Sequence, residues 1–189
     1  VQFIARMAEV IGQRSEVLTF AVSPVSPLSF PDDCVETIIE IASLGIPIAP
    51  LPCPTAGTTA PFSISAAVAQ QNAEILAAVT LAQLATPGLP VIYCGRLAMM
   101  EPHTGLSVWG GVETGLASAL TVQLGHHYGL PVNVYGFSTN AHEMDVQNGF
   151  ERAINAILPA LAGADELSGI GEMEAGISKS TLRKSSNRT

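Results

Sequence analysis

The stretch that decides the fold is Ala82-Gln83-Leu84-Ala85-Thr86-Pro87-Gly88-Leu89-Pro90-Val91-Ile92-Tyr93, which lies within the uncharged residues 75–95. Its Thr86-Pro87-Gly88 turn separates apolar residues at helical spacing from a short apolar run, and this pattern predicts a helix, a turn and a strand. Similar units occur on both sides of it. We expect strands at residues 17–22, 46–50, 90–94, 131–135 and 166–170, with helices between them.

Capping and stop signals mark the expected helices. A first helix is expected at residues 2–12. The next begins at Asp32 or Asp33 and ends at Gly45. Longer helices follow Ser63 or Ser65 and precede Gly129. The last helix follows Asp145, a good N-cap residue, and its helical spacing rests on Phe150, Ile154, Ile157 and Leu161.

Alternating strands and helices require parallel strands, because each helix returns the chain to the same end of the sheet. The architecture is either an open doubly wound sheet or part of a barrel. The first strand-to-helix loop contains no G-x-G-x-x-G, the usual signature of a dinucleotide-binding sheet. Since a complete barrel takes about 250 residues, we predict an α/β fold that is a partial (β/α)8 TIM barrel with about five parallel βα units.

Composition and charge exclude several classes of protein. Charged residues make up 13% of the chain and apolar residues 48%, which excludes a disordered chain and a coiled coil. The net charge is −8, although four of the eight basic residues fall within residues 179–189. An acidic body does not suit nucleic acid or an anionic membrane, so we expect neither as a partner.

Other features bear on compartment and domains. We expect no membrane span and no secretory leader. Three widely spaced cysteines without a C-x-x-C pair indicate reduced thiols in a cytoplasmic protein. We predict a partial-barrel domain over residues 1–177 and a disordered basic tail over residues 178–189. An incomplete barrel exposes two sheet edges, so we also expect a homo-oligomer.

Polar and aromatic residues gather in the loops that follow the expected strands, which form the functional face of a barrel. A tryptophan face beside carboxylates suits a quaternary ammonium ion, and a histidine near an acid suits proton transfer. Packing and ordinary loop polarity explain each residue singly. The candidate site residues are Tyr93, Glu101, His103, Trp109, Phe137, Asn140, His142 and Glu172.

Three other groups are alternative candidates for a site. Residues 57–63 run toward a helix start and either bind an anion or only form a turn with a cap. His126 and His127 end a helix, where the helix dipole explains them without a function. A zinc ion would need Cys53, Cys94, His103 and His142 to converge, and no recognised ligand spacing supports this, so we predict no metal.

Several runs of the chain, in order over about residues 10–176, form a further pattern. They are Ser26-Pro27-Leu28, Gly57-Thr58-Thr59-Ala60-Pro61, Gln71-Asn72-Ala73-Glu74-Ile75-Leu76, residues 82–93, Tyr128-Gly129-Leu130-Pro131, the Asp145, Gln147 and Gly149-Phe150-Glu151 run, and Ala160-Leu161-Ala162-Gly163-Ala164. Together they resemble the trimethylamine:corrinoid methyltransferase superfamily, which includes glycine betaine methyltransferases. Its members are longer, so the chain resembles their middle section.

The resemblance implies a (β/α)8 barrel that passes a methyl group from a methylated amine to the cobalt of a corrinoid (cobalamin) carried on a separate protein. One branch of the family uses pyrrolysine. This sequence has none, so it resembles the other branch, which is linked to quaternary amines such as glycine betaine. The corrinoid-binding pattern D-x-H-x-x-G is absent here, consistent with cobalt arriving on a partner.

On this hypothesis Tyr93, Trp109 and Phe137 form a cage for the cation, and Glu101 or Glu172 balances its charge. The substrate carboxylate would be bound by His103, Asn140 and His142, and we rank Glu101, His142 and Glu172 as the catalytic candidates. Two alternatives remain open. One is a zinc-dependent barrel methyltransferase, and the other is a catalytically incomplete fragment that self-associates.

Overall fold

The computed structural model describes residues 3, 6, 9–10, 18–173 and 178–179. Each of the five predicted strands is present within the predicted range or one residue beyond it. The helix predicted at residues 2–12 lies largely outside the described residues. The five strands are β1 (Phe20–Val22), β2 (Ile48–Pro50), β4 (Tyr93–Gly95), β7 (Val132–Tyr135) and β8 (Glu166–Ser168).

These strands run parallel and neighbour one another in chain order. Phe20 pairs with Ile48 in β1 and β2, Tyr93 with Val132 in β4 and β7, and Asn133 with Glu166 in β7 and β8. A parallel bridge between Ile48 and Val91 links β2 to the residues just before β4. The fold is therefore mixed α/β with parallel pairing.

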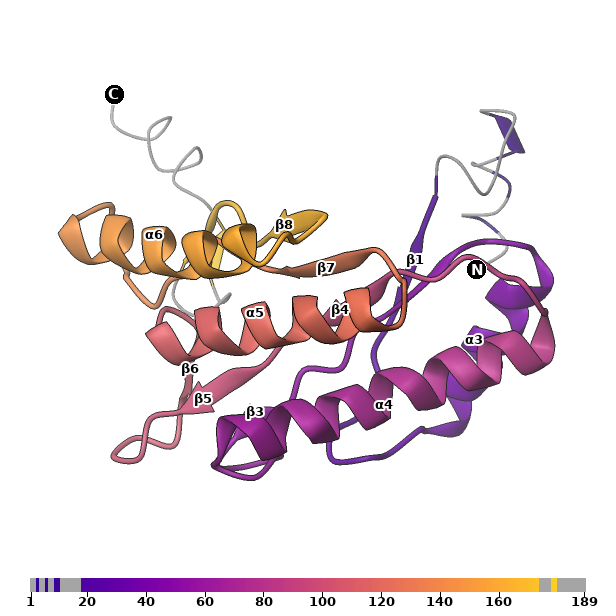
Figure 1. Cartoon of the computed structure of the whole chain (residues 1–189), viewed down its shortest axis with the longest axis horizontal. Helices are drawn as coiled ribbons and strands as arrows, with labels where there is room; N and C mark the ends of the chain where they lie inside the picture. Colours follow the sequence, from indigo (N-terminus) through magenta and orange to yellow (C-terminus); the bar gives the residue numbers. More distant parts are fainter. Residues whose placement is uncertain (1–2, 4–5, 7–8, 11–17, 174–177, 180–189) are drawn as a thin grey trace.

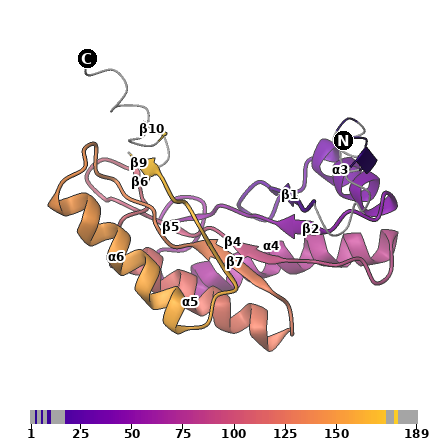
Figure 2. The same ribbon diagram turned by 90° about the horizontal axis from the view of Figure 1, so that it is seen from above.

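Four helices connect the strands and pack on one another in chain order. Figure 1 and Figure 2 show α4, α5 and α6 side by side along the strands. Three of the helix starts agree with the sequence signals, because α3 begins at Asp32, Ser63 precedes α4, and Asp145 caps α6 by accepting a hydrogen bond from the Asn148 amide at 2.9 Å. The helices are α3 (Asp32–Ser43), α4 (Ile64–Ala85), α5 (Val112–His127) and α6 (Val146–Leu161).

Short strands that the sequence did not predict lie in the loops. A small sheet joins β3 (Thr55–Ala56), β5 (Ala98–Met100) and β6 (Ser107–Val108), in which β5 and β6 are antiparallel. Two further strands, β9 (Glu172–Met173) and β10 (Ser178–Lys179), form an antiparallel pair. The rest of the predicted tail lies outside the described residues.

The core lies between the strands and the helix layer. Its central cluster joins Tyr93, Val132 and Val134 of the strands to Ile75 of α4 and Val122 of α5. All five are fully buried. Burial of each such side chain stabilises the fold by about 1.5–3 kcal/mol, so this cluster fixes which face of β4 and β7 meets the helices.

A buried carboxylate ties three distant segments together. Glu74 on α4 is fully buried and accepts hydrogen bonds from the Ser26 hydroxyl at 2.7 Å and the Leu28 amide at 2.9 Å. The Gln70 amide nitrogen donates both to Glu74, at 3.0 Å, and to the Thr59 carbonyl, at 2.8 Å. The loops after β1 and β2 are therefore fastened to α4.

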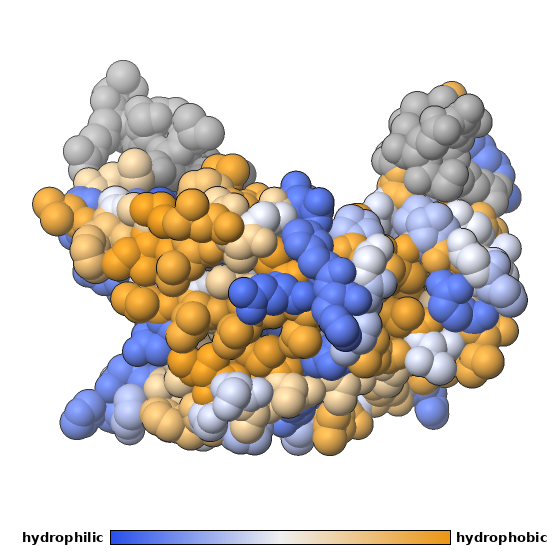
Figure 3. Space-filling view, in the orientation of Figure 1, coloured by the Kyte–Doolittle hydropathy of each residue, from blue (hydrophilic) through white to orange (hydrophobic). Residues whose placement is uncertain are grey.

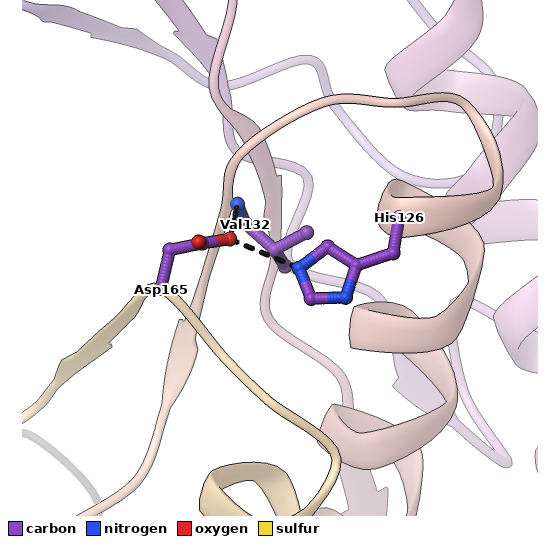
Figure 4. A network of polar contacts seen from close by, with 3 residues as sticks. All are labelled: His126, Val132 and Asp165. Carbon is purple, nitrogen blue, oxygen red and sulfur yellow. Dashed lines mark hydrogen bonds and ion pairs between the residues drawn. The ribbon is translucent and has the colours of Figure 1, made fainter.

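A second contact joins the end of α5 to the start of β7 and to the residue before β8 (Figure 4). The Asp165 carboxylate accepts a hydrogen bond from the Val132 amide at 2.8 Å and lies 3.0 Å from His126 Nε2. The hydrogen bonds from His126 and Val132 lower the pKa of Asp165. His126 thus has a structural partner in addition to its place at the end of α5.

Replacing Glu74 tests the first contact. We expect Glu74→Ala to lower the free energy of unfolding by about 2–4 kcal/mol, because it leaves the Ser26 hydroxyl and the Leu28 amide without an acceptor. Urea unfolding followed by circular dichroism measures this. Glu36→Ala, on the exposed side of α3, should change stability by less than about 0.5 kcal/mol. Equal effects would contradict the assigned role.

The Asp165 contact predicts a pH dependence. A lowered carboxyl pKa contributes stability above the unfolded value of about 3.9 and loses it as the pH falls through the folded pKa. Asp165→Asn should therefore cost up to about 1 kcal/mol at pH 7 and progressively less below pH 4. Glu143→Gln, an exposed control, should show no such trend. Urea unfolding curves of both proteins at several pH values measure this difference in the free energy of unfolding. A difference that does not change with pH would refute the role assigned to the Asp165 carboxylate.

Candidate functional site

The loops after β4, β7 and β8 meet at the carboxyl ends of the strands, and α6 holds them together. Asn140, in the loop after β7, is central to this junction. Its side-chain oxygen accepts hydrogen bonds from the Trp109 and Gly110 amides, both at 2.8 Å, and its nitrogen donates to the Ser107 carbonyl at 3.2 Å. Asn140 therefore holds the loop that carries Trp109.

The inner face of α6 supplies the next contacts. The Glu151 carboxylate accepts hydrogen bonds from the Thr139 hydroxyl at 2.6 Å and the Asn140 amide at 2.8 Å. The Asn155 side chain donates to the Trp109 carbonyl at 3.1 Å. A Cβ atom at Gly110 would overlap the Glu151 carboxylate, so a larger residue there would displace this carboxylate from its hydrogen bonds.

Arg152 connects two further predicted site residues. Its guanidinium donates to the carbonyl of Phe137 and to the carbonyl of Glu172, the latter at 2.6 Å, and to the Asn148 side chain at 2.8 Å. The pKa of Arg152 is lowered, because desolvation lowers it more than the negative charge of Glu172 raises it. Trp109, Phe137, Asn140 and Glu172 are thus joined through contacts on one helix, α6.

An aromatic and cationic stack lies on the sheet face away from the core cluster. The Trp109 ring meets the Tyr135 ring edge to face, with centroids 5.2 Å apart. The Arg96 guanidinium lies over the same Tyr135 ring, 4.3 Å from its centroid. Burial raises the pKa of Tyr135, and the negative charge of Glu172 raises it further. The Tyr135 ring therefore contacts Trp109 and the Arg96 cation and lies within electrostatic reach of the Glu172 carboxylate.

Arg96 is a buried cation surrounded by neutral groups. It is 5% exposed and donates to the Gly95 carbonyl, to the carbonyl and side chain of Asn133, and to the Ser168 hydroxyl at 2.7 Å. Its Nε is buried without a hydrogen-bond partner, and among the described residues no carboxylate forms an ion pair with it. Buried charges are usually paired, so Arg96 is suited to an anionic ligand group.

The structure separates Tyr93 from this stack and corrects its predicted place in the cage. Tyr93 is fully buried in the core cluster, and its hydroxyl donates to the Asn72 side chain of α4 at 2.6 Å. Burial raises its pKa far above the usual value. Alternate strand residues face opposite sides of a sheet, so Tyr93 faces the helices, whereas the Cys94 thiol faces Asn133 on the other side.

Glu101 and His103 lie in the turn between β5 and β6, in a hairpin that Figure 1 shows projecting from the molecule. The Glu101 carboxylate accepts a hydrogen bond from the Thr104 amide at 2.7 Å. Hydrogen bonds from the His103 and Thr104 backbone and the Thr104 hydroxyl lower its pKa. Glu101 therefore stabilises its own turn. His103 is exposed there, and His142 is exposed in the loop after β7.

The segment at residues 57–63 forms a closed turn. The Gly57 amide donates to the Ala60 carbonyl at 2.8 Å, and the Thr58, Thr59 and Ala60 amides all donate to the Thr55 carbonyl. These amides are used within the loop, which favours the turn interpretation over anion binding.

The cysteines do not form a metal site with the other candidates. Burial raises the pKa of Cys94 to about 11 and also raises that of Cys53, so neither thiol is activated. Within the described part of the chain, no three His, Cys, Asp or Glu side chains gather closely enough to hold a metal ion. The zinc alternative therefore has no ligand set there.

Sequence reasoning missed Tyr135 and most of the residues that build the site. One signal was available: residues 1–178 contain only Arg6, Arg14, Arg96 and Arg152 as basic residues, and two of these four lie in the site. No comparable signal marked the polar inner face of α6. The residues missed were Arg96, Tyr135, Glu151, Arg152 and Asn155.

No helix in the described part of the chain is both long and apolar enough to cross a membrane.

The trimethylamine methyltransferase (MTTB) family matches residues 4–183. A trimethylamine methyltransferase, MttB1, of Methanosarcina mazei is 34% identical over 166 residues, covering 88% of this chain and 34% of the relative.

Two bacterial relatives give the same picture. Trimethylamine methyltransferase MttB of Desulfitobacterium hafniense is 33% identical over 82% of the chain, and the glycine betaine methyltransferase of another strain of that species is 29% identical over 79%. They are matched over 32% and 31% of their own lengths. The chain thus spans about a third of these relatives, and it belongs to the trimethylamine methyltransferase family.

Proposed function

We propose that this chain is the middle part of a methyltransferase that moves a methyl group from a quaternary or tertiary methylamine, of the glycine betaine type, to the Co(I) of a corrinoid on a separate protein. Family membership gives the reaction class. The observation that carries the assignment to these residues is the Trp109–Tyr135 pair beside Glu172, at the carboxyl ends of β4, β7 and β8.

We also propose that the five parallel strands are part of a (β/α)8 barrel. Support comes from their chain-order pairing and from the row of packed helices that joins them. Functional groups of such barrels lie in the loops after the strands, which is where Trp109, Asn140 and Glu172 are found. The remaining units would come from a longer protein, because the matched 166 residues make up only 34% of the relative.

The proposed reaction requires little acid–base catalysis from the residues of this chain. A quaternary ammonium releases a neutral amine when it loses a methyl group, so no general acid is needed, whereas a tertiary amine would first have to be protonated. The partner's cobalt would supply the nucleophile. The chain's residues must hold the methyl group in line with the acceptor and keep water out. The aromatic face of Trp109 attracts the cation, and the Glu172 carboxylate offsets its charge.

Arg96 favours a zwitterionic substrate within this proposal. A betaine carries a carboxylate close to its ammonium group, and Arg96, stacked on Tyr135, lies close to the proposed cation site. Trimethylamine has no such group. His142 and Phe137 remain proposed site residues, Phe137 by its link through Arg152 to Glu172.

The reaction is tested by incubating the chain with cob(I)alamin and a panel of betaines and trimethylamine, and following methylcobalamin by its visible spectrum. We expect product with a methylated amine, and Trp109→Leu should lower kcat/KM by about tenfold, because a desolvated cation–π contact contributes roughly 1–2 kcal/mol. Tyr128→Leu, at the other end of the sheet, is the matched control. No product from the chain or from a full-length protein containing it would contradict the proposal.

Arg96 gives a test of substrate class. Arg96→Gln should raise KM for a betaine by about tenfold or more and leave KM for trimethylamine nearly unchanged, because only the betaine loses a partner. Comparing the two substrates on the same variant corrects for any loss of folded protein. Equal effects on both would show that Arg96 does not contact a substrate carboxylate.

A further inference from the structure

Cys53, in the segment after β2, stands opposite Arg96 in the sheet. The Arg96 amide donates to the Pro52 carbonyl at 3.2 Å, and two residues further along Thr55 pairs with Ala98 in the same parallel register. This register sets Cys53 against Arg96. Residues paired across neighbouring strands have their side chains on the same face of a sheet, so the Cys53 thiol and the Arg96 side chain share one face.

The same row of side chains continues to β8. The Arg96 guanidinium lies over the Tyr135 ring, 4.3 Å from its centroid. Tyr135 pairs in turn with Ser168 of β8, whose hydroxyl accepts a hydrogen bond from Arg96 at 2.7 Å. Cys53 therefore extends the candidate site, which is built by the loops after β4, β7 and β8, to the segment after β2.

Arg96 has one donor left for a ligand. A guanidinium has five N–H groups, and four of them donate to the Gly95 carbonyl, the Asn133 carbonyl and side chain, and the Ser168 hydroxyl. These acceptors belong to β4, β7 and β8. The remaining group, Nε, is buried without a hydrogen-bond partner. Because every one of the four acceptors is neutral, the charge of Arg96 is not balanced by them.

The position opposite Arg96 would suit a pairing carboxylate, because opposite charges on neighbouring strands stabilise a sheet. The chain instead has a small thiol there. Cys53 is exposed, and its thiol donates a weak hydrogen bond to the Leu51 carbonyl at 3.7 Å. Desolvation raises the pKa of this thiol, the charge of Arg96 lowers it, and the charges of Glu74 and Glu172 raise it. A neutral side chain thus lies within electrostatic reach of Arg96 and of Glu172.

We propose that Cys53 borders the carboxylate subsite and is a specificity-determining residue for zwitterionic amines. A small neutral side chain at this position leaves the Arg96 charge unpaired and leaves space beside it for the carboxylate of a betaine. The inference rests on the proposed function, in which Arg96 binds that group. A methylated amine without a carboxylate gains no contact there, and an acidic side chain at position 53 would take the place of the ligand's carboxylate.

Thiol labelling tests the position of Cys53 without any substrate. The folded chain is treated at low salt with iodoacetate, an anion, or with neutral iodoacetamide, and mass spectrometry measures the labelling of each cysteine. We expect a higher iodoacetate-to-iodoacetamide ratio at Cys53 than at Cys34, where the neighbouring Asp33 repels the anion. Arg96→Gln should lower the ratio at Cys53 by about fivefold and leave that at Cys34 unchanged.

The ratio separates charge from other effects. A change in the pKa of the thiol alters both reactions alike and cancels. Cys94 is 3% exposed, so its labelling reports unfolding of a variant. A folded Arg96→Gln protein with an unchanged ratio at Cys53 would overturn the proposal.

A pair of variants at position 53 tests specificity with Arg96 intact. Cys53→Asp places a carboxylate opposite Arg96, and Cys53→Asn has the same shape without the charge. Calorimetric titration should give a Kd for glycine betaine at least tenfold higher in Cys53→Asp than in Cys53→Asn. The Kd for tetramethylammonium should be equal or lower in Cys53→Asp, because this ligand has no carboxylate and the added charge attracts it.

Opposite effects on the two ligands cannot come from partial unfolding, which weakens both. Equal effects of Cys53→Asp on both ligands would overturn the role of Cys53 alone. Binding of neither ligand by the wild-type chain or by a full-length protein containing it would overturn the proposed function, and this subsite with it.

Discussion

The carboxylate of Glu151 is the contact on which the candidate site depends. One of its oxygens accepts from the Thr139 hydroxyl and the Asn140 amide, and the other accepts from the Gln147 side chain. Asn140, held in this way, fixes the backbone at Trp109. Because loops carry many backbone groups that need partners, a single charged acceptor on a rigid helix can order two loops at once.

The rest of the inner face of α6 extends this principle to the third loop. Arg152 binds the carbonyls of Phe137 and Glu172, and Asn155 binds the carbonyls of Trp109 and Ser138. On α4, Glu74 does the same for the loop after β1, and Gln70 for the loop after β2. Polar residues on the inner side of the helix layer thus form hydrogen bonds with the loops at the carboxyl ends of the strands. These hydrogen bonds offset the cost of burying the polar side chains.

The sequence predicted the five parallel strands and four connecting helices well, because long apolar runs alternate with Gly and Pro punctuation and with caps such as Asp145. It could not predict which side of β4 faces the helices. Tyr93, Cys94 and Gly95 are all buried. Because polar and apolar residues do not alternate in this strand, the sequence does not show which residues face the helices. The β5–β6 hairpin was missed for a different reason: Glu101 stabilises its turn through backbone contacts that leave no periodic signal.

The orientation of α6 could not be read from periodicity either, because a helical pattern shows that a face is apolar but not where that face points. Its buried side is set by the loops, which require acceptors and donors such as Glu151 and Asn155. That requirement removes apolar area from the side where a helix usually gains its stability. Figure 3 shows apolar surface over α6 and the adjoining part of α5. The exposed residues Phe150, Ile157 and Leu161 therefore hold much of the stabilisation still available to the helix, and covering them would strengthen the element that positions the site loops.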